Sequence, residues 1–316
     1  MGEVVGAGLL SHVPTIMLPR ETRLELNEGK EISLVPALQR IRAEKFETLD
    51  YDTVVVLDSH WFTTVEFVVT SHRRRAGLFT AEELPRGMCR IPYEWRGDPE
   101  LAESIASFAE PNGTWITPID DEYLPLYYPS VNLWSYLGKG LDKQWISMSV
   151  CQTGDTDDFL RVGRAIGQAI AATDRKVILI ATGSLSHTFY KLKELRKHEA
   201  SDPSHIISQK ARDMDHERLG WFFEGRHDRV LDTMPEFLTV RPEGMFAHYL
   251  MMAAALGEHD FAAPGVQYGD YENSIGTGQV HLWFDRPRDG FPPPRRTATD
   301  PEYVRQMSGP DLPAAG

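Results

Sequence analysis

The sequence predicts an α/β domain in which helices cover both faces of a central β-sheet. Apolar runs rich in β-branched residues alternate along the chain with segments of helical periodicity, which is the pattern of such folds. Neither an internal repeat nor a strong linker interrupts residues 1–285, so we expect one domain there. The chain has 316 residues, 41% of them hydrophobic, which is enough for a core of that size.

Six apolar segments are expected to form strands. Each is short, rich in aliphatic residues and bounded by polar or turn-forming residues. They span residues 4–10, 54–58, 65–71, 145–150, 177–182 and 279–284.

Four further segments place apolar residues at helical spacing. They span residues 34–49, 157–172, 208–223 and 243–256. Thr156 or Asp157 is expected to cap the second of them. The last is so apolar that we expect a largely buried helix.

Two stretches read as loops, because they are rich in Pro, Gly and aromatic residues. They span residues 73–100 and 110–130, and loops set on a rigid sheet are where pockets usually form. Residues 286–316 contain seven prolines and form a predicted tail, either flexible or lying as an extended arm on a neighbouring subunit.

The composition excludes several classes of partner and compartment. A formal net charge of −13 disfavours nucleic acid or an anionic membrane as the main partner. The two cysteines, Cys89 and Cys151, form no CxxC motif, which disfavours a disulfide framework and excludes a cysteine-rich zinc site. The start of the chain lacks the basic region of a signal peptide, and no apolar window reaches the length of a membrane span. We therefore expect a cytoplasmic protein.

Three of the strand-like segments lead into a Ser-His pair. The histidines are His12, His60 and His187, and ligands of open α/β sheets bind beyond the carboxyl ends of strands. Neutral imidazoles bind iron, zinc, copper or nickel, and two of them with one carboxylate form the facial triad of non-haem Fe(II) oxygenases. Spacing alone leaves an ordinary hydrogen-bonded loop role open for each histidine.

Glu243 is a candidate for the carboxylate of such a triad. It follows Pro242 and opens the apolar segment 243–256. The alternative is a first-turn carboxylate that interacts only with the helix dipole.

Several segments in order resemble one enzyme family. They are "GLLSHVPTIML", "VVVLDSHWF", "FTAEELPRGM", "ATGSLSHTF", "MPEFL…PEGMFAHYL" and "GTGQV". Together, over about residues 4–285, they resemble the class III, LigB-type extradiol ring-cleavage dioxygenases, with the homoprotocatechuate 2,3-dioxygenases of that class as the nearest likeness. The resemblance implies a LigB-type domain with a mixed central sheet flanked by helices.

The resemblance also implies roles for particular residues. Fe(II) would be held by His12, His60 and Glu243, while His187 would act as the acid–base histidine. Some members of the family carry a further active-site histidine in a "DHG"-like stretch, where this chain reads "LPLYYPS". Tyr128 in that stretch is expected to donate a hydrogen bond to substrate or oxygen. His248 is either a pocket residue or an ordinary helix histidine.

The implied reaction is extradiol cleavage of a catechol-like ring with O₂, which gives a muconic semialdehyde-type product. The alternatives are cleavage of an aminophenol or dihydroxypyridine on the same site, a Zn or Mn enzyme that is not an oxygenase, and a partner-binding module. The relatives also imply a homo-oligomer.

Six loop residues are expected near the substrate's side chain: Arg86, Arg90, Tyr93, Trp95, Tyr123 and Tyr128. Gly276 and Gly278 are expected to permit unusual backbone angles in a tight turn.

Overall fold

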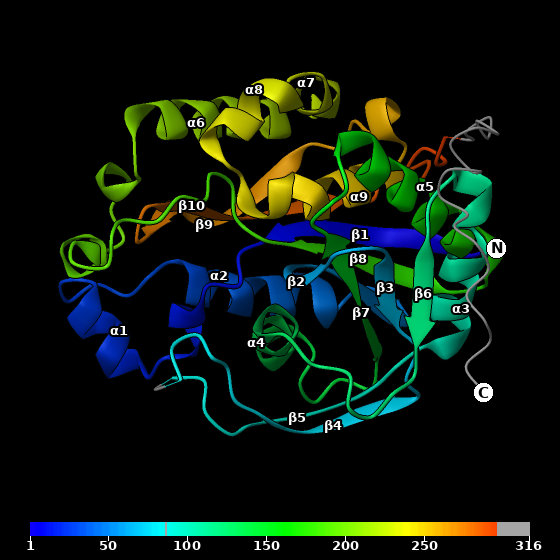
Figure 1. Cartoon of the computed structure of the whole chain (residues 1–316), viewed down its shortest axis with the longest axis horizontal. Coiled ribbons are helices and arrows are strands. Elements are labelled where there is room, and N and C mark those ends of the chain that lie inside the picture. The colour runs from blue at the N-terminus through cyan, green and yellow to red at the C-terminus, as the bar shows by residue number, and fades with distance from the viewer. Residues whose placement is uncertain (86, 296–316) are drawn as a thin grey trace.

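A computed structural model describes residues 1–85 and 87–295 and confirms the mixed α/β architecture (Figure 1). The strands are β1 (Glu3–Leu10), β2 (Thr53–Thr63), β3 (Phe67–Thr70), β4 (Arg74–Phe79), β5 (Ile91–Arg96), β6 (Ile116–Ile119), β7 (Gln144–Cys151), β8 (Lys176–Thr182), β9 (Gly265–Ser274) and β10 (Thr277–Asp285). The α-helices are α1 (Arg20–Leu26), α2 (Leu34–Ile41), α3 (Pro99–Ser107), α4 (Tyr128–Leu137), α5 (Thr156–Ala172), α6 (Gln209–Phe223), α7 (His227–Asp232), α8 (Met234–Phe237) and α9 (Ala247–Ala255).

All the strands belong to one sheet, in the order β4-β5-β7-β2-β8-β1-β10-β9, with β3 pairing with β6 and β7. The central strands β7, β2, β8 and β1 run parallel, whereas β10 is antiparallel to β1. In Figure 1 the arrow of β1 runs from the N-terminus toward the end of the molecule where α1 lies. The carboxyl ends of β1, β2 and β8 therefore meet at that edge.

The sheet is buried on both faces. Val55 and Leu57 of β2 belong to a core that includes α5 and α9, while Val54 and Val56 belong to a second core that includes α2 and α4. Figure 1 shows these helix pairs on opposite sides of the sheet. Because both faces are covered, the strand reads as a continuous apolar run rather than an alternating one.

Three predicted helices are found with adjusted ends. The first ends as an α-helix at Ile41 and continues as a wider turn over Arg42–Phe46. The second is α5, but its N-cap is Asp155 rather than Thr156 or Asp157. The Asp155 carboxylate accepts from the N–H groups of Asp157 and Asp158, and the Asp158 carboxylate accepts from the N–H of Asp155, which is a capping box. The third is α6, capped by Ser208.

The two predicted loops contain regular structure, so that part of the prediction is wrong. Residues 73–100 contain the β4–β5 hairpin and the start of α3, and residues 110–130 contain β6 and the start of α4. Pro118 lies within β6, which pairs only with β3 and is therefore an edge strand, where a missing N–H is tolerated. Strand β9 was also not predicted from the sequence.

The first ten residues of the predicted tail pack on their own chain. Phe291 packs against the core that contains α5 and α9, and Pro292 lies against Gly257. The Arg295 guanidinium lies 3.6 Å from the Asp260 carboxylate. These three residues therefore contact their own chain, and residues 296–316 of the predicted tail lie outside the described residues. Within residues 1–85 and 87–295, no helix combines the length and apolarity that a membrane crossing needs.

Candidate active site

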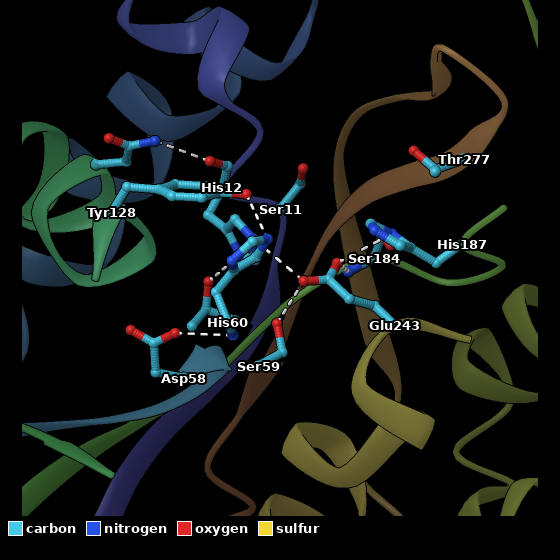
Figure 2. Close-up of polar contacts among 12 residues, drawn as sticks. Ser11, His12, Asp58, Ser59, His60, Tyr128, Ser184, His187, Glu243 and Thr277 are labelled. Carbon is cyan, nitrogen blue, oxygen red and sulfur yellow. Dashed lines mark hydrogen bonds and ion pairs between the residues drawn. The ribbon is translucent and has the colours of Figure 1, made fainter. Parts of the chain in front are cut away.

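The three predicted histidines arise from neighbouring parallel strands. His12 follows β1, His60 lies near the end of β2, and His187 follows β8, which pairs with both of the other strands. Figure 2 shows His12 and His60 facing Glu243 on one side, with His187 on the other side of Glu243. The topology therefore gathers residues from positions 12 to 243 at one edge of the sheet.

A bulge in β2 positions His60. The pairing of β2 with β7 shifts between Asp58 and Phe62, and β2 continues to Thr63. The sequence had predicted a strand over residues 54–58, which would have ended before His60. Oδ1 of the buried Asp58 accepts hydrogen bonds from the N–H groups of His60 and Trp61, at 3.0 and 3.2 Å. Asp58 thus holds the bulge that turns His60 out of the regular strand. Trp61 is buried and stacks on Tyr127.

His12 is held on both sides of its ring. Its Nδ1 lies 2.7 Å from the Thr182 hydroxyl, at the end of β8, and its backbone carbonyl accepts a hydrogen bond from the Asn132 amide of α4. Its Nε2 lies 3.2 Å from Oε1 of Glu243. Because Nδ1 has its own partner, Nε2 is the nitrogen that is directed at the site.

Glu243 lies in a strained turn and not on a helix, which corrects the predicted helix over 243–256. Gly244, Met245 and Phe246 have φ angles of 53°, 57° and 62°, so the α-helix begins only at Ala247. Left-handed angles are rare for residues such as Met and Phe, and such strain often accompanies functional sites. The Glu243 N–H donates to the carbonyl of Leu185, which fixes the turn against the loop that carries His187.

The Glu243 carboxylate is buried without a Lys or Arg partner among the described residues. Oε1 accepts a hydrogen bond from the Ser59 hydroxyl at 2.5 Å, and Oε2 accepts one from the Ser184 N–H at 2.7 Å. Burial alone would raise its pKa, but His12 and His187 hold the pKa of Glu243 well below its usual range. A buried anion in such surroundings is suited to a cation.

The donor atoms of His12, His60 and Glu243 all lie within 4.8 Å of one another. Burial lowers the pKa of His60 to about 4, so its imidazole is neutral at physiological pH and its lone pair is available to a metal. Two imidazoles and one carboxylate from three separate segments fit a divalent iron, manganese or zinc ion and leave coordination positions open.

His187 lies beside this group of donors and not among them. Its Nδ1 is 2.6 Å from the Ser184 hydroxyl and 3.4 Å from Oε2 of Glu243, and burial lowers its pKa. The imidazole faces the same cavity as the three donors and is free to exchange a proton with a bound molecule.

Asp215 of α6 anchors the loop that carries His187, which we call the His187 loop (residues 183–187). Its carboxylate accepts hydrogen bonds from the N–H and hydroxyl of Ser186, at 3.0 and 2.6 Å, and from the Tyr271 hydroxyl at 2.6 Å. Burial raises the pKa of Asp215 to about 6. The sequence analysis missed Asp215, because nothing in the pattern of α6 distinguishes it from other polar residues.

The hairpin between β9 and β10 completes this anchor. Gly276 has a φ of 114°, as predicted for a tight turn, but Gly278 does not have a positive φ. Gly278 is required for a different reason: its N–H donates to the Ser186 carbonyl, and a Cβ there would lie 2.2 Å from the Asp215 carboxylate.

Of the other two predicted catalytic residues, only Tyr128 faces the cavity. Its hydroxyl lies 2.7 Å from Nε2 of His60, and burial raises its pKa above the ordinary value. It is therefore a hydrogen-bond donor and not a base. His248 is fully buried and is not among the cavity-lining residues, because its ring lies beneath Gly183.

A cavity of about 470 Å³ opens onto the site. Its lining includes His12, His60, Tyr128, His187 and Glu243, together with side chains from α1, β9 and the segment that follows the His187 loop. Of the other predicted substrate contacts, the lining does not include Arg90, Tyr93, Trp95 or Tyr123, and Arg86 lies outside the described residues. Trp95 instead packs on Trp134 in the core, and Tyr123 is exposed.

Two known proteins resemble this chain over most of its length. The chain is 26% identical over 259 residues to the 3,4-dihydroxyphenylacetate 2,3-dioxygenase of Escherichia coli, which covers 81% of this chain and 91% of that protein. It is 22% identical over 310 residues to the 2-aminophenol 1,6-dioxygenase beta subunit of a Pseudomonas species, covering 92% and 96% of the two chains.

A solved structure matches the fold, and a family model matches the sequence. The fold resembles that of an uncharacterized protein of Escherichia coli K12, with a TM-score of 0.57 at 15% identity over 89% of this chain and 99% of that one. The family model described as the catalytic LigB subunit of aromatic ring-opening dioxygenase matches residues 6–281. The resemblance seen in the sequence is thereby confirmed: the chain belongs to the LigB family and is an aromatic ring-opening dioxygenase.

Proposed function

We propose that the protein cleaves a catechol-like ring beside its two hydroxyl groups, using O₂ and an Fe(II) ion held by His12, His60 and Glu243. The observation that carries the proposal is the meeting of these three donors, all within 4.8 Å, at the wall of a cavity that a small aromatic molecule can enter. When bound, Fe(II) would supply adjacent positions for the diol and for O₂ and a route for electrons between them.

The chain's own residues would position the substrate and move its protons. Because a hydroxyl bound to a metal is acidified, a nearby base can accept its proton, and His187 is the imidazole at the cavity wall that is not a metal donor. Ser184 holds Nδ1 of His187, which leaves Nε2 for the substrate. If a metal took Nε2 of His60, the Tyr128 hydroxyl would lose that acceptor and would be free to donate to the substrate or to O₂.

The test is anaerobic reconstitution with Fe(II), followed by metal analysis, oxygen uptake and a spectroscopic screen of catechols for yellow ring-opened products. The wild type should bind about one iron per chain and consume O₂ with at least one catechol. His60→Ala should lose the iron, whereas His187→Phe should keep it and turn over roughly 10²–10⁴-fold more slowly.

Two results would count against this function. Iron binding that survives in His60→Ala would remove His60 from the metal site. Full occupancy by zinc or manganese without oxygen uptake on any catechol would favour a metal enzyme of another kind.

An aminophenol is the second candidate substrate, because one relative is named for the cleavage of 2-aminophenol. It belongs in the same screen, where oxygen uptake with an aminophenol and not with catechols would favour it. We also propose that the protein assembles as an oligomer, since one of the relatives is named as a beta subunit. That its subunits are identical and that it resides in the cytoplasm are proposals that rest on the sequence alone. Light scattering would test the assembly.

A further inference from the structure

The charges around the cavity limit the substituent that the substrate can carry. The lining includes four glutamates, Glu83, Glu199, Glu243 and Glu272, of which only Glu243 belongs to the proposed metal site. Among the described residues, the only Lys or Arg side chain of the lining is Arg23. The part of the cavity beyond the metal donors is therefore acidic.

Arg23 is already fully engaged. Its Nε and Nη2 donate to the two carboxylate oxygens of Glu31, at 2.7 and 2.9 Å, and its Nη1 donates to the carbonyl of Leu18 at 2.6 Å. The side chain is 9% exposed, and the pairing with Glu31 raises the pKa of Arg23. The bidentate face that an arginine would use to clamp a substrate carboxylate is thus occupied by a carboxylate of the protein.

Glu272 of β9 presents the opposite situation, a buried carboxylate with no cation. It is 5% exposed, and no Lys or Arg among the described residues forms an ion pair with it. Its oxygens accept from the Ser33 N–H and the Ser201 hydroxyl, both at 2.6 Å. Burial raises the pKa of Glu272, because a charged carboxylate is less stable out of water than in it. A cation in the cavity would stabilise the charged carboxylate.

Apolar walls strengthen these charges. Leu26, Phe189, Leu195 and Ile275 line the same cavity as Glu199 and Glu272. A charge on a bound molecule would have little water around it here, so its interaction with the glutamates would be larger than in bulk solvent. Among the described lining residues, a carboxylate would meet like charges and no unengaged Lys or Arg, whereas an ammonium would meet carboxylate acceptors.

We propose that the enzyme selects aromatic substrates whose ring substituent ends in a protonated amine, and that Glu272 and Glu199 set this preference while Arg23, held by Glu31, is withheld from carboxylates. This inference rests on the proposed ring cleavage at His12, His60 and Glu243. It concerns the distal part of the same cavity, and it separates this chain from a relative named for 3,4-dihydroxyphenylacetate, which carries a carboxylate.

The test compares three catechols with the same two-carbon arm, which ends in an ammonium, a methyl group or a carboxylate. With the iron-loaded wild type, kcat/KM should be about tenfold higher for the ammonium than for the methyl compound, and lowest for the carboxylate. Anaerobic calorimetry with the same three compounds should give the same order of affinity. The order should weaken as the salt concentration rises.

Three variants identify the residues responsible. Glu272→Gln should reduce the preference for the ammonium over the methyl compound about tenfold, and Glu199→Gln should reduce it by less, because Glu199 is more exposed. Glu31→Gln, which releases the Arg23 guanidinium, should raise kcat/KM for the carboxylate compound alone. Glu103→Gln, an exposed position on α3 outside the cavity lining, removes the same charge and should change none of these ratios.

The possible outcomes separate the two claims. If the three compounds are all cleaved but the ammonium is not preferred over the methyl compound, or the carboxylate is best, the selection by charge is wrong while the ring-cleavage function stands. If none of a broad set of catechols is cleaved by the iron-loaded protein, the proposed function itself fails. Equal losses for all three compounds in Glu272→Gln would show that Glu272 only ties Ser33 to Ser201. The wild-type series needs no variant, so an unstable variant cannot obscure the result.

Discussion

At the scale of single residues, the site depends on side chains that orient the proposed metal ligands without being donors themselves. Thr182 holds Nδ1 of His12, Ser59 holds Oε1 of Glu243, and Asp58 holds the backbone at His60. Such partners fix the tautomer and direction of a metal ligand, and their removal commonly weakens metal binding 10–100-fold.

Thr182→Val tests this view, because it keeps the shape of the side chain and removes the hydroxyl at His12. We expect Fe(II) affinity to fall about 10–100-fold while the thermal midpoint of the metal-free protein changes little. Competition with a fluorescent chelator measures the affinity. Thr239→Val, at an exposed position that is not part of the cavity lining, is the control and should bind iron as the wild type does. Unchanged affinity in Thr182→Val would show that Thr182 does not orient His12.

The sequence predicted the donor residues better than the residues around them. His12, His60 and His187 could be found because each follows a recognisable apolar strand, and the structure brings all three to one edge of the sheet. The predicted aromatic and cationic contacts on residues 90–123 failed, because that stretch folds as strands and helices away from the cavity. Arg23 and Glu272 were missed, since α1 and β9 carry no strong periodic signal in the sequence.

At the scale of elements, the His187 loop is held between the start of β10 and helix α6. Leu185 donates to the carbonyl of Gly278, Gly278 donates to the carbonyl of Ser186, and Asp215 accepts from Ser186. The strained turn at Glu243 is joined to the same loop through the carbonyl of Leu185. His187 and Glu243 are therefore positioned by one connected set of backbone contacts.

A pair of glycine substitutions tests this anchor. In Gly278→Ala the new methyl group would overlap the Asp215 carboxylate and crowd the Tyr271 hydroxyl, so we expect a loss of about 1–3 kcal/mol in unfolding free energy and a larger fall in kcat than in iron content. Gly220→Ala, on α6 with open space at the same distance, should instead stabilise the protein by up to about 1 kcal/mol. Denaturant unfolding and oxygen uptake measure the two effects. Full activity in Gly278→Ala would contradict the proposed role of this contact.

The helix predicted over residues 243–256 begins later than expected, for a reason that residue types do not reveal. The segment 243–256 has the composition of a buried helix, and residues 247–255 do form α9. The first turn is left-handed, however, because Glu243 must point into the cavity while Phe246 enters the core. Tertiary contacts of Glu243, among them those with Ser59, Ser184 and Leu185, hold that conformation, and the residue types of the segment do not reveal them.

At the scale of the whole molecule, buried neutral histidines link folding to pH. His227 is fully buried, with its ring nitrogens bonded to the Tyr249 hydroxyl and the Ala263 carbonyl, and burial lowers its pKa to about 4. An unfolded histidine takes up its proton near pH 6.5, so acid favours the unfolded chain. The stability that this residue contributes is therefore complete above about pH 6.5 and is lost as the pH falls from there to about 4.

His227→Gln should flatten this dependence, because an amide can serve both partners without titrating. Between about pH 7 and pH 4, we expect the wild type to lose roughly 3 kcal/mol more unfolding free energy than the variant. Urea unfolding of the metal-free proteins at a series of pH values measures it. Parallel pH profiles for the two proteins would mean that His227 is not the residue responsible.

The order of strands explains why distant residues can form one site. β2, β8 and β1 lie side by side in the sheet and run in the same direction, so His60, His187 and His12 meet although they are far apart along the chain. The alternation of strands and helices predicted such a sheet, but not the order of its strands or the mixed edge formed by β9 and β10, which depends on long-range pairing.

The central claim is that one iron ion is bound jointly by two imidazoles and one carboxylate at this edge of the sheet. Diffraction from crystals of the iron-loaded protein, collected on both sides of the iron absorption edge, locates the metal directly. We predict a single anomalous peak within bonding distance of Nε2 of His12, Nε2 of His60 and a carboxylate oxygen of Glu243. A peak elsewhere, or one that lacks any of these three ligands, would contradict the account.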